Sequence, residues 1–298
     1  MAVFRSIILC GFALLATPLS AELPAAATYA SPSDEYLSID GTRIRVRMEG
    51  PAKAPPIILI HGFSFSLESW DAWAADLARD HRVIRFDLAG HGLSDADAKG
   101  RYATADRVRQ LVALMDRLHV RRPTIAGNSY GGLVAWNLAA QHPGRVDRLI
   151  LVDAGAYSIN GVTEKPVAVP PPMRAYLQAP SPAAVAYSAG LIFAHPEKLP
   201  PARLALMQEM IARNGPALIA HLEQFTLPPP NAALARVKAP TLILWGRADK
   251  VIPVAQASDL AAAIPGSKLI IYDDVGHAPQ EEASARSIAD VRAFLNEK

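Results

Sequence analysis

The sequence contains the stretch Gly127-Asn128-Ser129-Tyr130-Gly131, which has the pattern G-x-S-x-G. An apolar run at residues 122–126 precedes it and is typical of a buried parallel strand. Residues 132–140 follow it with the composition of a helix. A serine on such a strand-to-helix turn is held in a strained, exposed position, and the two glycines leave room for the tight turn. The surroundings therefore favour a nucleophilic serine at position 129 over an incidental serine in a glycine-rich turn.

Short apolar runs alternate with helical patterns on both sides of this turn. We expect a hairpin around Asp40-Gly41. This alternation predicts an α/β fold with a mostly parallel, doubly wound sheet of about eight strands, covered by helices on both faces. Outside the hairpin and the serine strand, the expected strands are residues 57–60, 82–87, 148–153, 241–245 and 268–272.

The alternation stops between residues 157 and 239, a segment rich in proline and alanine. It contains helical patches such as residues 201–214 and no convincing strand, so we interpret it as a helical lid inserted after the sixth strand. The predicted organisation is a signal peptide at 1–21, a linker at 22–34, the first part of the core at 35–156, the lid at 157–239 and the second part of the core at 240–298.

The first residues have the composition of a secretory signal peptide. Arg5 supplies a positive charge, residues 7–15 are mostly apolar, and Ala21 offers a cleavage site. The apolar run is too short to span a bilayer comfortably. We expect an exported protein, periplasmic or extracellular, without a stable membrane span in its mature form; an uncleaved N-terminal anchor is the alternative. Cys10 is the only cysteine, so removal of the signal leaves no disulfide and no thiol nucleophile.

The charge of the chain is nearly balanced. It has 298 residues, with 30 Lys and Arg against 28 Asp and Glu and a net charge of +2. No basic stripe or acidic tail stands out in the sequence, so nucleic acid is not an expected partner.

A serine hydroxyl becomes an effective nucleophile when a neighbouring base takes its proton and a third group orients that base. His277 follows the last predicted strand, and Asp249 follows the strand before it. Both side chains are expected at the carboxyl edge of the sheet, where the serine turn also lies. The chain order Ser129, Asp249, His277 is typical of such sheets. Asp153, which ends the strand after the serine strand, is the alternative acid.

The oxyanion formed after attack needs two fixed N–H donors. We assign them to Tyr130, directly after the serine, and to Phe63, in the loop after an earlier strand. His61 and His91 lie in glycine-containing loops near the predicted site and are expected to shape those loops. No cluster of His, Asp and Glu has the spacing of metal ligands in the sequence, so a metal is not expected.

The motifs together resemble those of the α/β-hydrolase superfamily, over nearly the whole mature length. They look most like the serine-nucleophile branch with a helical lid, which holds simple esterases and carbon–carbon bond hydrolases. The resemblance implies a two-step acyl transfer in which Ser129 attacks a carbonyl, His277 moves the proton and Asp249 holds the imidazole. It also implies that neither a metal nor an organic cofactor is required. The segments that carry the resemblance are residues 61–63, 87–94, 127–132, 246–249 and 276–277.

The lid is expected to shape the substrate pocket, and its apolar side chains suggest an apolar, uncharged small molecule. The leading hypothesis is a serine hydrolase that cleaves a small or medium apolar carboxylic ester. The predicted pocket residues are Phe65, Trp70, Met173, Tyr176, Tyr187 and Phe193.

Other functions remain open on the same residues. A carbon–carbon bond hydrolase of the meta-cleavage product type would need a basic residue for the substrate carboxylate, and the lid offers Arg174, Lys198, Arg203 and Arg213. A lactonase would use the same triad. A non-catalytic ligand-binding protein on the same fold is the alternative from another class.

Overall fold

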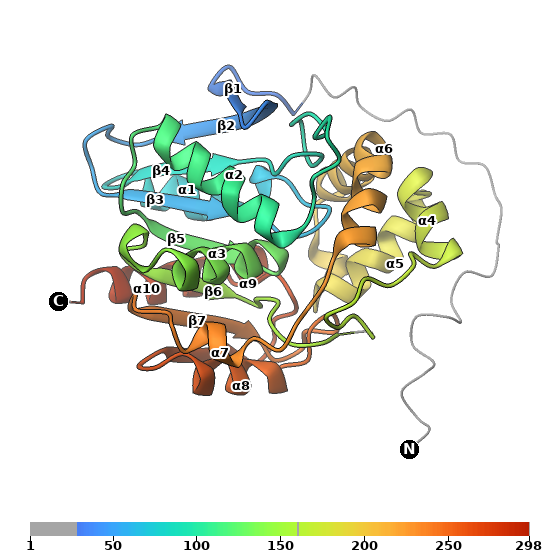
Figure 1. The fold of residues 1–298 in the computed structure, drawn as a ribbon. Coiled ribbons are helices and arrows are strands. Elements are labelled where there is room, and N and C mark those ends of the chain that lie inside the picture. The colour runs from blue at the N-terminus through green and yellow to red at the C-terminus, as the bar shows by residue number, and fades with distance from the viewer. Residues whose placement is uncertain (1–28, 160, 298) are drawn as a thin grey trace.

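The computed structural model describes residues 29–159 and 161–297. An eight-stranded sheet runs through it in the order β1-β2-β4-β3-β5-β6-β7-β8 (Figure 1). The β1–β2 and β2–β4 pairs are antiparallel and the remaining pairs are parallel, which confirms the predicted α/β class and the N-terminal hairpin. The strands are β1 (Asp34–Ile39), β2 (Thr42–Glu49), β3 (Pro56–Ile60), β4 (Arg82–Phe86), β5 (Thr124–Asn128), β6 (Leu149–Val152), β7 (Thr241–Gly246) and β8 (Lys268–Tyr272).

Helices cover both faces of the sheet, as an all-apolar parallel strand requires. One face packs against α2 (Thr104–Arg117), α3 (Tyr130–Gln141) and α8 (Ala255–Ala263). The other packs against α1 (Asp71–Leu77), α9 (Pro279–Glu282) and α10 (Ser284–Leu295). Two short 3₁₀ turns, η2 (Leu67–Trp70) and η3 (Pro143–Arg145), join these layers.

The lid helices follow β6 and gather beyond one end of the sheet (Figure 1). Each of the three α-helices begins with a proline, whose fixed φ suits the first helical position and whose missing N–H is not needed there. The segment comprises α4 (Pro171–Gln178), α5 (Pro182–Ile192), η4 (Pro196–Lys198) and α6 (Pro201–Gln224), and α7 (Asn231–Leu234) leads back to the sheet.

The sequence predicted a helical patch that ends at Asn214, and that boundary is wrong. The helix α6 continues through Pro216 for 24 residues in all. Proline removes one backbone hydrogen bond from a helix, but apolar packing on both sides of it offsets that loss. Ile211 and Leu218 are buried on either side of the proline, against Leu177 of α4.

The N-terminal prediction falls largely outside the structure. The predicted signal peptide, residues 1–21, and Cys10 lie outside the described residues. Within the described part of the chain, no helix has both the length and the apolar character needed to cross a bilayer.

Candidate active site

Ser129 lies on the turn between β5 and α3, with φ 54° and ψ −117°. A non-glycine residue in such a region costs of the order of 1–3 kcal/mol and persists where its surroundings force it. Close packing of the neighbouring backbone holds Ser129 in this conformation. A Cβ on Gly127 would lie only 2.3 Å from the carbonyl oxygen of Gly131. A Cβ on Gly131 would lie equally close, 2.3 Å, to the carbonyl oxygen of Ile60. Ser129 itself is half-buried while both its neighbours are buried.

Backbone hydrogen bonds lock the serine turn to the next strand. The N–H of Ser129 donates to the carbonyl oxygen of Val152 at 2.9 Å. Its carbonyl oxygen accepts from Leu133 at 3.1 Å and from Gly155 at 3.0 Å. The strained residue is therefore fixed by α3, by β6 and by the loop that follows β6.

His277 and Asp249 form a hydrogen-bonded pair on the loops after β8 and β7. Nδ1 of His277 lies 2.7 Å from Oδ2 of Asp249. The other carboxylate oxygen, Oδ1, accepts from the N–H groups of Val251 at 2.7 Å and Ile252 at 2.9 Å. These three donors fix the carboxylate, and a neutral imidazole that donates from Nδ1 presents Nε2 as a proton acceptor.

Asn128 connects the serine turn to the histidine loop, a role that the sequence did not suggest. Its Nδ2 donates to the carbonyl oxygen of His277 at 3.0 Å and to that of Val152 at 3.1 Å. A polar residue at the end of an otherwise apolar strand was the available signal. Among the described residues the Ser129 hydroxyl has no hydrogen bond to His277, and such contacts are often long before substrate binds.

The loop after β3 lies directly beside the serine. A Cβ on Gly62 would come within 3.2 Å of the Ser129 Cβ, so the backbone of this loop approaches the serine as closely as glycine permits. Neither the N–H of Phe63 nor that of Tyr130 donates to another described residue. Tyr130 is the first residue of α3, where helix N–H groups have no partner inside the helix and attract anions.

The sequence model of the Alpha/beta hydrolase family matches residues 57–291, which is most of the chain. The chain belongs to this family. The eight-stranded, mostly parallel sheet is the fold that the motifs led us to expect, and the protein is an enzyme of the α/β-hydrolase type.

Several similar proteins have the names of hydrolases. A 2-hydroxymuconate semialdehyde hydrolase of Pseudomonas sp. (strain CF600) is 29% identical over 266 residues, covering 85% of this chain and 91% of that protein. An uncharacterized protein of Mycobacterium tuberculosis (strain ATCC 25618 / H37Rv) is 30% identical over 292 residues, covering 90% of this chain and 82% of that one. The solved structure of the enol-lactonase from Burkholderia xenovorans LB400 matches with a TM-score of 0.77 and 26% identity, over 88% of this chain and 100% of that chain.

Two loops of this α/β-hydrolase are held by buried side chains below the serine. His61 donates from Nδ1 to the Gly62 carbonyl at 2.7 Å and accepts from the Leu88 N–H at Nε2, 3.0 Å away. Burial lowers the pKa of His61 to about 4, so the ring is neutral at pH 7. Asp87 accepts from the N–H of Leu67 at 2.8 Å, which ties its loop to the one that carries the proposed oxyanion donor.

Three neutral histidines support the residues assigned to the oxyanion hole. His221 reaches in from the lid helix α6, with its ring centroid 4.2 Å from that of Tyr130 and 5.1 Å from that of Phe63. His91 lies 5.4 Å from both His61 and His221, centroid to centroid. Burial holds the pKa of His91 and of His221 well below the ordinary value. The contacts of His221 are those of a packing histidine.

Glu282 joins the lid to the histidine loop. Its Oε2 accepts from the N–H of Gly276 at 2.6 Å, and its Oε1 accepts from Ala194 at 2.7 Å and His195 at 3.1 Å. The N–H of His277 in turn donates to the Ile192 carbonyl, at 2.6 Å. The end of α5 and the loop that carries the histidine are therefore one hydrogen-bonded unit. No motif marks Glu282 in the sequence, because its role depends on how the lid packs.

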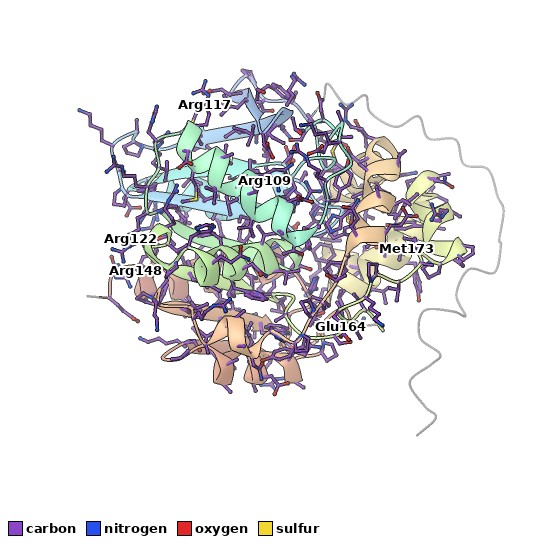
Figure 2. All side chains as sticks on the ribbon, in the orientation of Figure 1. Arg109, Arg117, Arg122, Arg148, Glu164 and Met173 are labelled. Carbon is purple, nitrogen blue, oxygen red and sulfur yellow. The ribbon has the colours of Figure 1, made fainter. Side chains whose placement is uncertain are left out.

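Apolar residues predicted for the pocket gather beside His277. Phe65 and Phe193 stack with centroids 6.5 Å apart, in a buried cluster that also contains Ala278 and contacts Tyr176. Met173 lies in the neighbouring cluster on α4, at the lid end of the molecule (Figure 2). These four residues lie at the junction of the lid and the sheet edge.

Two predicted pocket residues lie outside this apolar cluster. Trp70 is fully buried in the core on the α1, α9 and α10 side of the sheet, where its ring contacts Trp73 at 4.9 Å between centroids. Trp70 is therefore part of the core, and its assignment to the pocket is wrong. Tyr187 lies on α5 with 48% of its surface exposed, and its assignment to the pocket stays a prediction.

One group of three side chains in the described chain brings metal-ligating atoms within 4.8 Å of one another: Asp153, Asp249 and His277. The His277–Asp249 hydrogen bond and the two N–H groups on Asp249 already engage three of the lone pairs that a cation would need. The donor set therefore fits an acid–base pair better than a metal centre.

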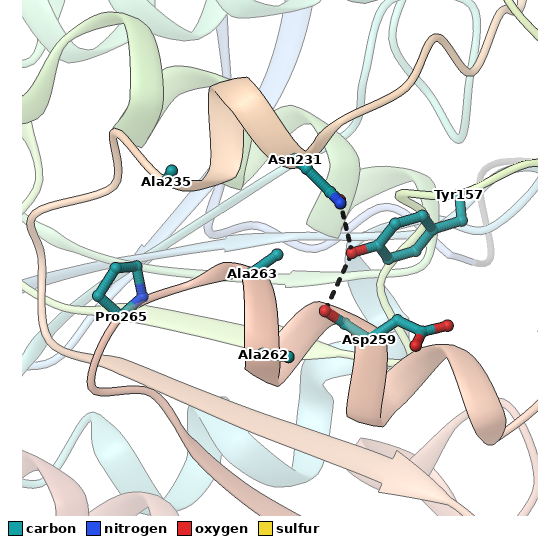
Figure 3. A pocket seen from close by; sticks show the side chains of 7 residues that line it. All are labelled: Tyr157, Asn231, Ala235, Asp259, Ala262, Ala263 and Pro265. Carbon is teal, nitrogen blue, oxygen red and sulfur yellow. Dashed lines mark hydrogen bonds between the residues drawn. The ribbon is translucent and has the colours of Figure 1, made fainter.

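A shallow groove between α7 and α8 lies apart from Ser129 (Figure 3). None of the residues that line this groove belongs to the serine site described above. The Tyr157 hydroxyl crosses it, 3.0 Å from Oδ1 of Asn231 and 3.0 Å from the carbonyl oxygen of Asp259. The hydroxyl can donate its one hydrogen to only one of these two acceptors at a time, and the residues that line the groove include none of Ser129, Asp249 and His277.

Proposed function

We propose that the protein is a serine hydrolase that cleaves a small or medium apolar carboxylic ester through an acyl-enzyme intermediate. The observation that carries the proposal is the strained Ser129 turn, tied through Asn128 to the loop on which His277 is paired with Asp249. A serine, a base and an orienting acid at one edge of the sheet are the set that acyl transfer requires.

We infer the following steps of ester cleavage, which this geometry supports. Nε2 of His277 takes the proton of Ser129 as the hydroxyl oxygen attacks the ester carbonyl. The N–H groups of Phe63 and Tyr130 receive the developing oxyanion, and both are free of other described partners. His277 then protonates the leaving alcohol. Water, deprotonated by the same nitrogen, hydrolyses the acyl-enzyme, while Asp249 stabilises the imidazolium at each step.

The lid supports an uncharged substrate. A carboxylate-bearing substrate would need a free basic residue in the pocket, and the lid candidates are otherwise engaged. Arg203 makes two hydrogen bonds to Glu281, at 2.7 and 2.8 Å. Arg174 pairs with Glu223 at 2.6 Å, and Lys198 and Arg213 are exposed. The ester hypothesis is therefore favoured over a carbon–carbon bond hydrolase that acts on an acid.

A lactone is a cyclic ester, so lactone hydrolysis uses the same groups. The structural similarity to an enol-lactonase makes it the second candidate. The ring size and polarity of the preferred substrate then depend on the apolar cluster around Phe65 and Phe193.

The test combines a mechanism-based label with substrate panels. We expect a fluorophosphonate probe to label the protein and p-nitrophenyl esters of increasing chain length to be turned over, with both signals lost in Ser129→Ala. Turnover of lactones but not of linear esters would favour the second candidate. Labelling without turnover of either would reject both substrate classes, and absence of labelling in a folded protein would reject the serine nucleophile.

We further propose that the enzyme is exported, on the composition of residues 1–21. Expression of the full chain, cell fractionation and N-terminal sequencing of the product test this. A cytoplasmic product that retains Met1 would reject it, and a membrane-bound product with an intact N-terminus would support the anchor instead.

A further inference from the structure

A third buried carboxyl group, that of Asp153, lies at the catalytic edge of the sheet. Asp153 directly follows β6, is fully buried and has φ 44°. Its Oδ1 accepts from the N–H of Gly246 at 3.0 Å. Its Oδ2 has no donor among the described residues. A strained backbone and an unpaired buried oxygen each cost free energy, so other interactions around Asp153 must stabilise this conformation.

Asp153 also forms a cluster with Asp249 and His277, in which one ligand atom from each side chain lies within 4.8 Å of the other two. Asp249 accepts three hydrogen bonds. Two ionised carboxylates at this separation in a buried site repel strongly, and one of the two retains a proton in such pairs. Asp153, which accepts a single hydrogen bond, is the group that retains it.

The other charged groups around Asp153 act in the same direction. Burial raises the pKa of Asp153 well above its usual value, the charge of Asp249 raises it further and Glu282 adds to the effect, while the Gly246 N–H opposes it. Tyr272 and His277 are further titratable neighbours; the Tyr272 hydroxyl donates to Asp290, and His277 is paired with Asp249. The charged groups with the largest effect on Asp153 are both carboxylates.

We propose that Asp153 is protonated in the resting enzyme and donates its O–H to the Asp249 carboxylate, as a positioning residue for the acid of the catalytic pair. This inference rests on the proposed function, since it assigns a role beside the same histidine. The proton stays on Asp153 throughout turnover. The hydrogen bond withdraws charge from Asp249, directs its Oδ2 toward Nδ1 of His277 and so limits how strongly the imidazolium is stabilised.

The proposal has a second consequence. When Asp249 is replaced by a neutral residue, the repulsion that keeps Asp153 protonated disappears. The Asp153 carboxyl group, one oxygen of which lies within 4.8 Å of a ring nitrogen of His277, can then ionise and serve as a substitute acid. Asp249→Asn should therefore retain more activity than Asp249→Asn combined with Asp153→Asn.

The main experiment compares Asp153→Asn with Asp153→Gly. Both residues tolerate positive φ, so neither adds backbone strain, but only the amide can donate to Asp249. We expect Asp153→Gly to slow turnover about tenfold, the effect of one hydrogen bond to a charged group, because Asp249 is no longer held in position. The acid limb of the pH profile should move to higher pH, because the full charge of Asp249 then attracts the imidazolium more strongly. Asp153→Asn should restore most of the rate and the original acid limb.

Two readouts keep the inference separate from the substrate assignment. The first is the rate of phosphonylation of Ser129, which needs the histidine and acid but not an ester, so it remains measurable if the ester hypothesis fails. The second is the infrared band of a protonated carboxylic acid at pH 7, which should be present in the wild-type enzyme and lost in Asp153→Asn. An unchanged band in that variant, or identical pH profiles for Asp153→Asn and Asp153→Gly, would overturn the proposal.

Discussion

The sheet edge and the lid are held in place by different kinds of contact. At the edge, Ser129 is fixed by backbone hydrogen bonds to adjacent strands and by glycines that no larger residue could replace. The lid is attached mainly through side chains, such as the Glu282 carboxylate and the Arg203–Glu281 pair. Backbone contacts depend on the fold alone, whereas side-chain contacts change with single substitutions. The comparison suggests that the sheet determines which reaction the site performs. The lid then adjusts the position of the reacting residues.

The two regions meet at the histidine. The N–H of His277 donates to the lid residue Ile192, and His221 of the lid packs on Tyr130. The base and one proposed oxyanion donor therefore each contact both regions. Substitutions at these meeting points separate the two contributions.

The largest effect is expected at the sheet edge. Phe63→Pro removes the proposed oxyanion N–H, so kcat should fall on the order of 10²–10³-fold while the fluorophosphonate probe still labels Ser129. Phe63→Ala is the matched control, because it removes the ring contacts to His91 and His221 but keeps the N–H. Equal losses in both variants would assign the effect to packing, and full activity of Phe63→Pro would eliminate this donor.

A smaller effect is expected where the lid is tied to the histidine loop. In Glu282→Gln an NH₂ group replaces one acceptor oxygen among three backbone N–H donors, so one end of the contact becomes repulsive. We expect kcat to fall about tenfold, equivalent to about 1.4 kcal/mol in the barrier. Glu281→Gln, which disturbs the lid through Arg203 without contacting the histidine loop, should act on KM more than on kcat. The opposite pattern would mean that the lid does not position the base.

The lid histidine should make stability depend on pH. Because burial holds the pKa of His221 well below 6.5, the unfolded chain binds a proton that the folded protein does not as the pH falls below 6.5. The free energy of unfolding therefore decreases as the pH is lowered below 6.5. His221→Phe keeps the aromatic packing and should reduce this slope by up to about 1.4 kcal/mol per pH unit.

Urea unfolding between pH 7.5 and about 4.5 measures this slope, with the exposed His142→Gln as the control for loss of a surface histidine. Asp87 and Asp153 have raised pKa values and act with the opposite sign, but they are the same in both proteins and cancel in the difference. Parallel curves for wild type and His221→Phe would show that His221 is not held neutral.

The smallest effect is expected when the backbone strain at Ser129 is removed. Glycine adopts the backbone angles of Ser129 without strain, whereas alanine does not. Ser129→Gly should therefore be more stable than the equally inactive Ser129→Ala by about 1 kcal/mol, measured by thermal or urea unfolding. If alanine is as stable as glycine at this position, the sheet edge carries little strain.

The sheet could be predicted from sequence because its signals are local. Apolar runs, the Asp40-Gly41 turn and the glycines around Ser129 each report on their own neighbourhood, and chain order indicated which acid lies beside His277. The structure pairs that histidine with Asp249.

The contacts of the lid could not be predicted in the same way. The helix α5 is apolar on all sides, so its pattern does not identify the buried face, on which Val185 and Ala189 lie. The helix α6 passes through Pro216 because packing outweighs local preference. Glu282 and Asn128 act on residues 88 and 149 positions away in the chain, and a single sequence does not identify such distant partners, even where a polar strand end marks Asn128 itself.

The Glu282 contact bears on how this enzyme would discriminate between esters. A substrate too large for the closed lid must displace the end of α5, and that displacement removes two of the three N–H donors from the same carboxylate that holds Gly276. A substrate whose acyl group fits poorly therefore also misaligns the base, His277. Selectivity against oversized esters should consequently appear in the turnover number, and not in binding alone.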